Sequence, residues 1–278
     1  MPSRLLSVVT VLFWLASMGW LCAVVWAPPE SRMAQVDARE VYSVFFNWNE
    51  STAMTLLENG VRRGQITIAG GSGEDPDTGV FVNSLSLSGT MESRETRNED
   101  GSPQIDLFWR GLLDFSKSLG LQSGNFSVRV PTRQLSAHFS MVRKPDAEEV
   151  EVSKESFDFK ARAVLNQQPV FEFDSLKGAG NALPLHLLPM KSMVGMESLD
   201  PQNLEIEAEA RMGKFSFGGR DLRAYLLILR RPGSEESVRV FFSEVGEPLK
   251  LETDYGFEAI SEMLVPLGAY SGGKEANS

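Results

Sequence analysis

Apolar and polar residues alternate through most of the chain beyond residue 60. The clearest run spans residues 104–115, where one parity holds apolar residues or glycine: Ile105, Leu107, Trp109, Gly111, Leu113 and Phe115. The charged residues of this run, Asp106, Arg110 and Asp114, have the other parity. Because successive residues of a strand point to opposite faces, such strands have one buried and one wet face. This pattern predicts an antiparallel sheet, since parallel strands are usually buried on both faces.

Further runs alternate in the same way, at residues 126–130, 135–141, 157–165, 203–212, 222–228 and 238–242. The segments between them hold the residues typical of hairpin turns, at 98–103, 123–124, 131–133, 231–234 and 245–248. No second linker divides this part, so we expect one antiparallel β domain over residues 61–268. Roughly ten strands are too many for a flat sheet, which should curl into a half-barrel-like shape with a concave apolar face.

An apolar run without any charged residue occupies residues 5–27. As a helix it would be about 34 Å long, enough to cross a hydrocarbon layer of ~30 Å. Arg4 is the positive flank, which should stay cytoplasmic. We therefore predict that residues 1–29 are a single-pass transmembrane signal-anchor in the cell (inner) membrane. The remaining chain would lie on the extracytoplasmic, periplasmic side. A signal peptide cleaved after Ala27 is the alternative.

Residues 30–60 are predicted to form a helical neck between this anchor and the β domain. Val36, Val41, Val44 and Phe45 recur at helical spacing, and Ser51 would cap a second short helix. A strand over residues 41–48 is the alternative. The polar tail, residues 269–278, is expected to be disordered.

The charge balance bears on the partners of the chain. It has 27 Lys and Arg against 37 Asp and Glu, a formal net charge of −10. This argues against nucleic acid and against electrostatic binding to anionic lipid, because both need clustered basic side chains. The only cysteine, Cys22, lies in the apolar run, so the predicted exported part can form no disulfide and no zinc–cysteine site.

Residues 183–199, LPLHLLPMKSMVGMESL, interrupt the alternation. Prolines cannot donate hydrogen bonds in a central strand, and the segment is too apolar for full exposure. We expect a helical or looped lid over the apolar face of the sheet, where methionines fill irregular space. The lid residues predicted to contact an apolar ligand are Leu185, Leu187, Leu188, Met190, Met193 and Met196. On the sheet face they are Leu107, Trp109, Leu113 and Phe115. Core packing without a ligand is the alternative.

Residues for reaction chemistry are scarce. The only histidines are His138, on the polar face of a predicted strand, and His186, in the lid. The sequence has no nucleophile elbow, no His-Glu-x-x-His and no P-loop. We predict that the protein is not an enzyme and has no catalytic residue, metal or cofactor. A thioether site for Cu(I) in the lid and a calcium loop at residues 70–79 are the weaker alternatives.

A resemblance to a known family adds to this interpretation. A curled antiparallel sheet with a lid in mid-sequence resembles the LolA/RseB-like periplasmic lipoprotein-carrier superfamily. The stretch VRVFFSEVGEPLKLETDYGF, residues 238–257, is similar to the paired strands near the end of that fold. The resemblance implies a half-barrel whose apolar concavity binds acyl chains. This chain departs from the family in its amino-terminal anchor, and no ligand residue is matched individually.

We therefore expect a non-catalytic, membrane-anchored β domain that binds a lipid, another hydrophobic ligand or a lipidated partner such as a lipoprotein. The alternative is a structural or assembly subunit of a membrane-associated complex. In that case the anchor and neck would pair with another membrane protein and the sheet would bind no small molecule.

Overall fold

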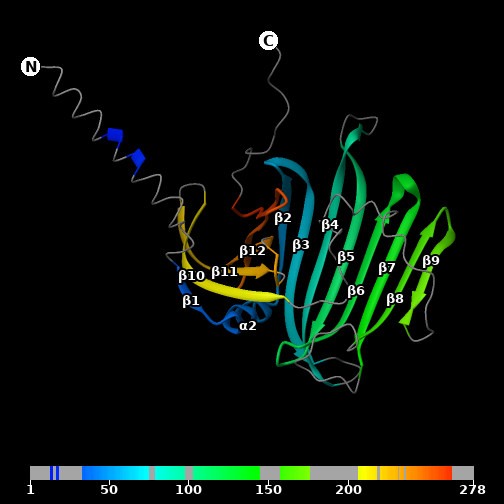
Figure 1. Ribbon diagram of the computed structural model, residues 1–278, viewed down its shortest axis with the longest axis horizontal. Coiled ribbons are helices and arrows are strands. Elements are labelled where there is room, and N and C mark those ends of the chain that lie inside the picture. The colour runs from blue at the N-terminus through cyan, green and yellow to red at the C-terminus, as the bar shows by residue number, and fades with distance from the viewer. Residues whose placement is uncertain are drawn as a thin grey trace, which may run out of the picture.

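The computed structural model describes residues 13–14, 17–18, 33–74, 79–97, 103–144, 157–175, 206–217, 220–230, 232–234 and 236–264. Its main feature is one open sheet of fourteen strands, in which every pairing is antiparallel. Figure 1 shows this sheet spread across the width of the molecule. The predicted antiparallel sheet is confirmed.

The elements of the first part of the chain are β1 (Ala34–Val36), α2 (Ala38–Trp48), β2 (Ser51–Glu58), β3 (Val61–Glu74), β4 (Phe81–Arg97), β5 (Pro103–Phe115), β6 (Leu121–Val130), the 3-10 turn η2 (Pro131–Arg133), β7 (Leu135–Arg143), β8 (Phe157–Leu165) and β9 (Gln168–Asp174). Those that follow are β10 (Glu207–Phe217), β11 (Arg220–Arg230), β12 (Ser237–Ser243), β13 (Pro248–Thr253) and β14 (Phe257–Ser261).

The order of the strands joins two meanders side by side. Strands β2 to β9 pair consecutively, and so do strands β10 to β14. Strand β14 pairs with β2, and β1 adds to the outer edge of β10. Four of the predicted turns, at 98–103, 131–133, 231–234 and 245–248, fall at connections within the meanders, between β4 and β5, β6 and β7, β11 and β12, and β12 and β13.

Helix α2 is the one long helix in the described part of the chain, and its ends are defined by capping. The Asp37 side chain accepts a 2.9 Å hydrogen bond from the Arg39 backbone N–H at the start. Asn49 ends the helix in the left-handed conformation. Val41, Phe45 and Phe46 of α2 are buried, so the helix has one apolar side that packs on the sheet.

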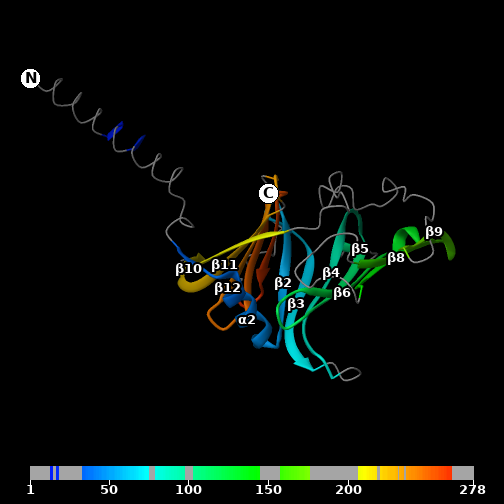
Figure 2. The ribbon, with the colours of Figure 1, turned by 60° about the horizontal axis from the view of Figure 1, so that its bottom comes forward.

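The sheet curves around α2. The helix contacts both β10 and β3, which stand six places apart in the order of the strands. Six flat spacings would cover about 29 Å, whereas a helix with its side chains is only about 10–12 Å wide. Figure 2 shows α2 between the part of the sheet with β10 to β12 and the part with β2 and β3. The helix thus fills the concavity of a bent sheet.

Aromatic rings connect the two sides of this concavity through α2. Phe45 lies 5.2 Å from Phe242 of β12, and Phe46 lies 5.7 Å from Phe115 of β5, between ring centroids. At the first turn, Glu40 accepts a 3.0 Å hydrogen bond from the hydroxyl of Tyr225 in β11. Burial, the hydrogen bond and the Glu40 charge raise the pKa of Tyr225. These contacts fix the position of α2 across the main hydrophobic core.

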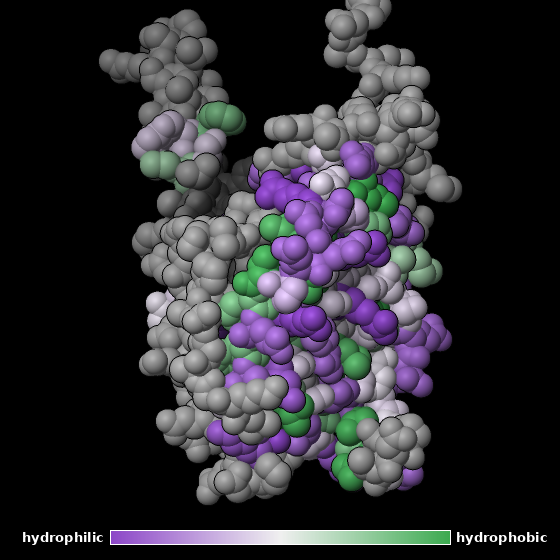
Figure 3. Space-filling view, turned by 90° about the vertical axis from the view of Figure 1, so that its right-hand side faces the viewer, coloured by the Kyte–Doolittle hydropathy of each residue, from purple (hydrophilic) through white to green (hydrophobic). Residues whose placement is uncertain are grey.

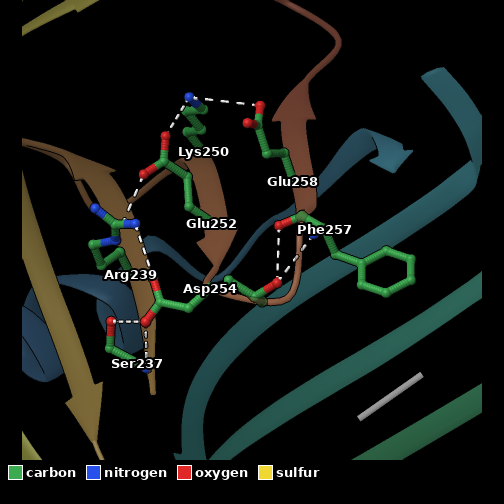
Figure 4. A network of polar contacts seen from close by, with 8 residues as sticks. Ser237, Arg239, Lys250, Glu252, Asp254, Phe257 and Glu258 are labelled. Carbon is green, nitrogen blue, oxygen red and sulfur yellow. Dashed lines mark hydrogen bonds and ion pairs between the residues drawn. The ribbon is translucent and has the colours of Figure 1, made fainter. Parts of the chain in front are cut away.

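A polar network joins β12, β13 and β14 on the outside of this core (Figure 4). Asp254 accepts hydrogen bonds from the backbone N–H and the hydroxyl of Ser237, at 2.7 and 2.9 Å. Arg239 forms ion pairs with Asp254 and Glu252. Lys250 continues the network to Glu252 and Glu258. The network links the start of β12 to the turn that follows β13.

The predicted helical neck over residues 30–60 is wrong in its second half and in its role. Only residues 38–48 are helical, and residues 51–58 form strand β2, so the sheet begins before residue 61. Strand β2 is buried on both faces around Met54 and Leu57, which removes the alternation that would have marked a strand. The helix packs into the core of the β domain and is therefore part of that domain.

Two smaller expectations are also corrected. Ser123 and Gly124 lie inside β6 and form no turn. Strand β11 was expected to have one wet face, but residues 224–228 are all buried. Its alternate residues enter two clusters on opposite faces, with Tyr225 and Leu227 on the α2 side and Ala224 and Leu226 on the other.

Several predictions fall largely or wholly outside the described residues. They concern the anchor at residues 1–29, the lid at 183–199 and the tail at 269–278; of the loop at 70–79, residues 75–78 lie outside, while residues 70–74 belong to β3. Within the apolar run the described residues, 13–14 and 17–18, are helical. Among the described residues no helix has the length and apolar character needed to cross a membrane.

Candidate functional site

The apolar face that packs on α2 continues across β5 to β9. The cross-strand pairs on this face include Gly111 with Phe126, Phe126 with Phe139, Phe139 with Ala161, and Ala161 with Phe173. The next row of the same face pairs Leu113 with Gly124, Gly124 with Met141, and Met141 with Phe159. Register alone therefore brings apolar side chains from five strands onto one surface.

We call five of these residues the aromatic strip: Phe126, Phe139, Met141, Phe159 and Phe173. They belong to neither of the two core clusters. None of them is fully buried, and Phe139 is 37% exposed to solvent. The rings of Phe139 and Phe159 lie 5.9 Å apart. The strip is thus an apolar surface beside the core that α2 does not fill.

Glycines set the shape of the surface leading to this strip. A Cβ at Gly89 would come within 2.7 Å of the Trp109 indole, and one at Gly124 within 2.6 Å of the Met141 methyl carbon. Gly111 lies similarly below Phe126, at 3.3 Å. Because these positions carry no side chain, a neighbouring bulky side chain lies over the backbone. These large side chains therefore lie close to the sheet backbone and form a shallow apolar surface.

The four sheet residues predicted as ligand contacts all lie on the apolar face, but they divide between two roles. Phe115 contacts Phe46 and Trp109 packs on the main core, so both help to hold α2. Leu113 lies beside Gly124 and Met141, next to the aromatic strip. Leu107 lies farther along β5, opposite Met91. The six predicted lid residues lie outside the described part of the chain.

The opposite face of β3 to β8 is polar and carries a hollow of about 700 Å³. Its lining includes Arg110, Arg129, Arg162 and His138, all with exposed side chains. His138 is on the polar face of β7, as the sequence predicted. The side of the molecule with β8 and β9 is mainly hydrophilic, with scattered hydrophobic residues (Figure 3).

Sequence reasoning did not find the aromatic strip or the arginine-lined hollow as sites. Strands β5 to β8 were recognised by their own alternation, whereas β3, β4 and β9 were not, and the members of both surfaces come from different hairpins. Their proximity depends on the register of four or more pairings, which no single run of sequence encodes. Phe126, Phe139 and Phe159 were nevertheless assigned to the apolar faces of their strands.

Two observations concern the titratable groups in the part of the chain that the structure describes. No group of three or more His, Cys, Asp or Glu is placed to hold a metal ion there. Asp114, on the polar face, accepts 2.7 Å hydrogen bonds from Ser84 and Ser123 and so ties three strands together.

Comparisons with protein-family models, with curated proteins and with solved structures found no match to this chain.

Proposed function

We propose that this protein is a non-catalytic binding protein that holds an acyl chain, or another elongated apolar molecule, on the aromatic strip. The apolar run at residues 5–27 would anchor it in the cell membrane with the sheet on the extracytoplasmic side. The segment at residues 183–199 would cover the bound ligand with its leucines and methionines. The half-barrel resemblance to lipoprotein carriers supports the same kind of ligand.

The observation that carries this proposal is the position of the aromatic strip. Apolar side chains in an ordinary core are buried, yet these lie outside both core clusters and stay partly exposed. All five are phenylalanine or methionine, and four of them lie on the adjacent strands β6 to β8, with ring-to-ring contact between two of these four. Flat rings and a flexible thioether suit a long, flexible hydrocarbon better than a compact polar substrate.

Uptake of a fluorescent fatty acid by the purified full chain tests the proposal. Phe139→Ser combined with Phe173→Ser should weaken uptake by about tenfold, because two apolar contacts are lost. Val142→Ser combined with Val170→Ser is the matched control, since both valines are exposed on the same two strands and neither belongs to the aromatic strip. Native mass spectrometry should also detect co-purified lipid.

The result that would contradict the proposal is a chain that carries no lipid and takes up no fatty acid. Equal losses in the phenylalanine and valine variants would also contradict it, since the strip would then have no specific part in binding. Circular dichroism of each variant separates a loss of binding from a loss of folding.

A further inference from the structure

The polar face of β3 to β8 brings together basic side chains that are far apart in the sequence. One row of cross-strand neighbours runs Thr67, Ser88, Arg110, Ser127, His138 and Arg162. The adjacent row contains Thr90, Phe108, Arg129, Ser136 and Val164. All of these residues line the same hollow.

The basic residues of the hollow, Arg110, Arg129, His138 and Arg162, lack protein counter-ions. None of the four forms a hydrogen bond or an ion pair in the described part of the chain, whereas Arg211, Arg223 and Arg239 each pair with a carboxylate. The chain as a whole has a net charge of −10, so this hollow differs in sign from the molecule around it. Such a group attracts an anion from outside the protein.

The described acidic residues nearest to this group form no ion pair with its arginines. Asp114 is held by Ser84 and Ser123, and Asp106 accepts a hydrogen bond from Thr132. Glu172 lies opposite Arg162 in the register, but the two form no ion pair. The carboxylates therefore border the hollow without neutralising its arginines.

The register also gives the spacing of the cations. His138 stands directly opposite Arg162, and Arg129 lies diagonal to Arg110 on the adjacent strand. Arg110 and Arg162 are three strand spacings apart, about 14 Å. Arginines on neighbouring strands, such as Arg110 and Arg129, repel each other unless an anion lies between them. The two pairs thus suit two anionic groups joined by a spacer, with Ser127 and Ser136 as hydrogen-bond donors between them.

Apolar side chains in the same hollow indicate what kind of anion fits. Phe108, which is 39% exposed, and Val164 lie on this face beside Arg129 and Ser136. A free phosphate ion gains nothing from such neighbours, but the glycerol and first acyl carbons of a lipid do. A volume of about 700 Å³ is large enough for a headgroup of this size.

From these observations we infer that the hollow binds the phosphorylated headgroup of a lipid, one with two phosphate groups. Bidentate contacts from arginine suit phosphate oxygens. This site lies on the face opposite the aromatic strip and does not depend on the proposed acyl-chain function. It also revises the expectation that anionic lipid is not bound electrostatically, because the sheet builds the basic cluster that the sequence does not show as a run.

Calorimetric titration of the full chain, held in a neutral detergent, tests this inference. The probe is dioctanoyl phosphatidylinositol phosphate, and dioctanoyl phosphatidylcholine controls for partition into the detergent. We expect the phosphatidylinositol phosphate to bind, and the phosphatidylcholine to give only the heat of partition into the detergent. Arg110→Gln with Arg162→Gln should weaken binding by about tenfold or more, because two charge-assisted contacts are lost. Arg223→Gln, an exposed arginine on β11, should change it less than about twofold.

Three results would overturn the inference: equal heats for the two lipids, equal effects of the Arg110/Arg162 and Arg223 variants, or equally tight binding of inositol bisphosphate without acyl chains. The last would assign the hollow to a soluble phosphate compound. Because Phe139 and Phe173 lie on the other face, their variants should bind the phosphorylated lipid normally. Failure of this site is therefore distinguishable from failure of the proposed acyl-chain site.

Discussion

At the scale of single residues, the pairing of a glycine with a large neighbour explains the shape of the apolar face. Trp109 lies over Gly89, and Met141 lies over Gly124. At both positions a large side chain therefore covers the backbone of a residue that has no side chain of its own. An added methyl group at either glycine would displace the side chain above it. Local glycines thus create a surface that a flexible apolar ligand can follow.

Asp254 is the residue whose charge contributes most clearly to the polar network of Figure 4. Burial alone would raise its pKa, but the hydrogen bonds from Ser237 and the charges of Arg239 and Arg230 outweigh burial and lower it. A carboxyl group with a lowered pKa stabilises the fold above its unfolded-state pKa. That stabilisation is lost as the pH falls through the folded-state pKa.

We therefore predict that Asp254→Asn lowers the free energy of unfolding by about 1 kcal/mol at pH 7, since an amide replaces one acceptor oxygen with a donor. The difference from wild type should shrink as the pH falls below 4. Urea unfolding at pH 7 and pH 3 measures both. Asp221→Asn is the control, because Asp221 is exposed and makes no polar contact in the described part of the chain. A loss that does not depend on pH would contradict this account.

At the scale of elements, α2 is held by the hairpin loop between β12 and β13 as well as by the core. Gly246 in this loop has a φ of 96°, and a Cβ there would lie 2.3 Å from the Val44 carbonyl oxygen. The loop therefore approaches the helix backbone at a distance that only glycine permits. This contact closes one end of the concavity in which α2 lies.

Gly246→Ala should lower the free energy of unfolding by about 2–3 kcal/mol, from backbone strain together with the clash against α2. Gly233→Ala isolates the strain, because Gly233 has a φ of 76° in the preceding hairpin and no atom within 4 Å of an added Cβ. That control should cost about 1 kcal/mol. Urea unfolding of both variants gives the difference, and equal losses would show that the approach to Val44 is unimportant.

Alternation predicted seven of the fourteen described strands, β5 to β8 and β10 to β12, and its failures have physical causes. Residues 104–115 and 157–165 alternate because each has one polar face, and both were recognised almost to the residue. Residues 51–58 were expected to be helical because β2 is buried on both faces and shows no period of two. Gly124 was assigned to a turn because sequence cannot distinguish a turn glycine from one that lies beneath a bulky neighbour.

At the scale of the whole molecule, one long sheet carries both candidate sites, the aromatic strip and the arginine-lined hollow, on its opposite faces. The strands from β10 to β3 in the order of the sheet bend around α2 and form the core. Strands β5 to β9 extend beyond the helix and have one apolar and one polar face. The sequence identified which residues of a strand share a face, but both candidate sites arise from register across several hairpins. Under the two proposals, the same strands would bind an acyl chain on one face and a charged headgroup on the other.

Photolabelling with a diazirine-bearing fatty acid tests the central claim most directly, because it reports where on the sheet an acyl chain lies. After irradiation of the full chain and digestion, the account predicts label on peptides from β6 to β9, residues 121–143 and 157–174. Phe139→Ser with Phe173→Ser should reduce that label, and Val142→Ser with Val170→Ser should not. Label confined to other peptides, or none that unlabelled fatty acid displaces, would contradict the account.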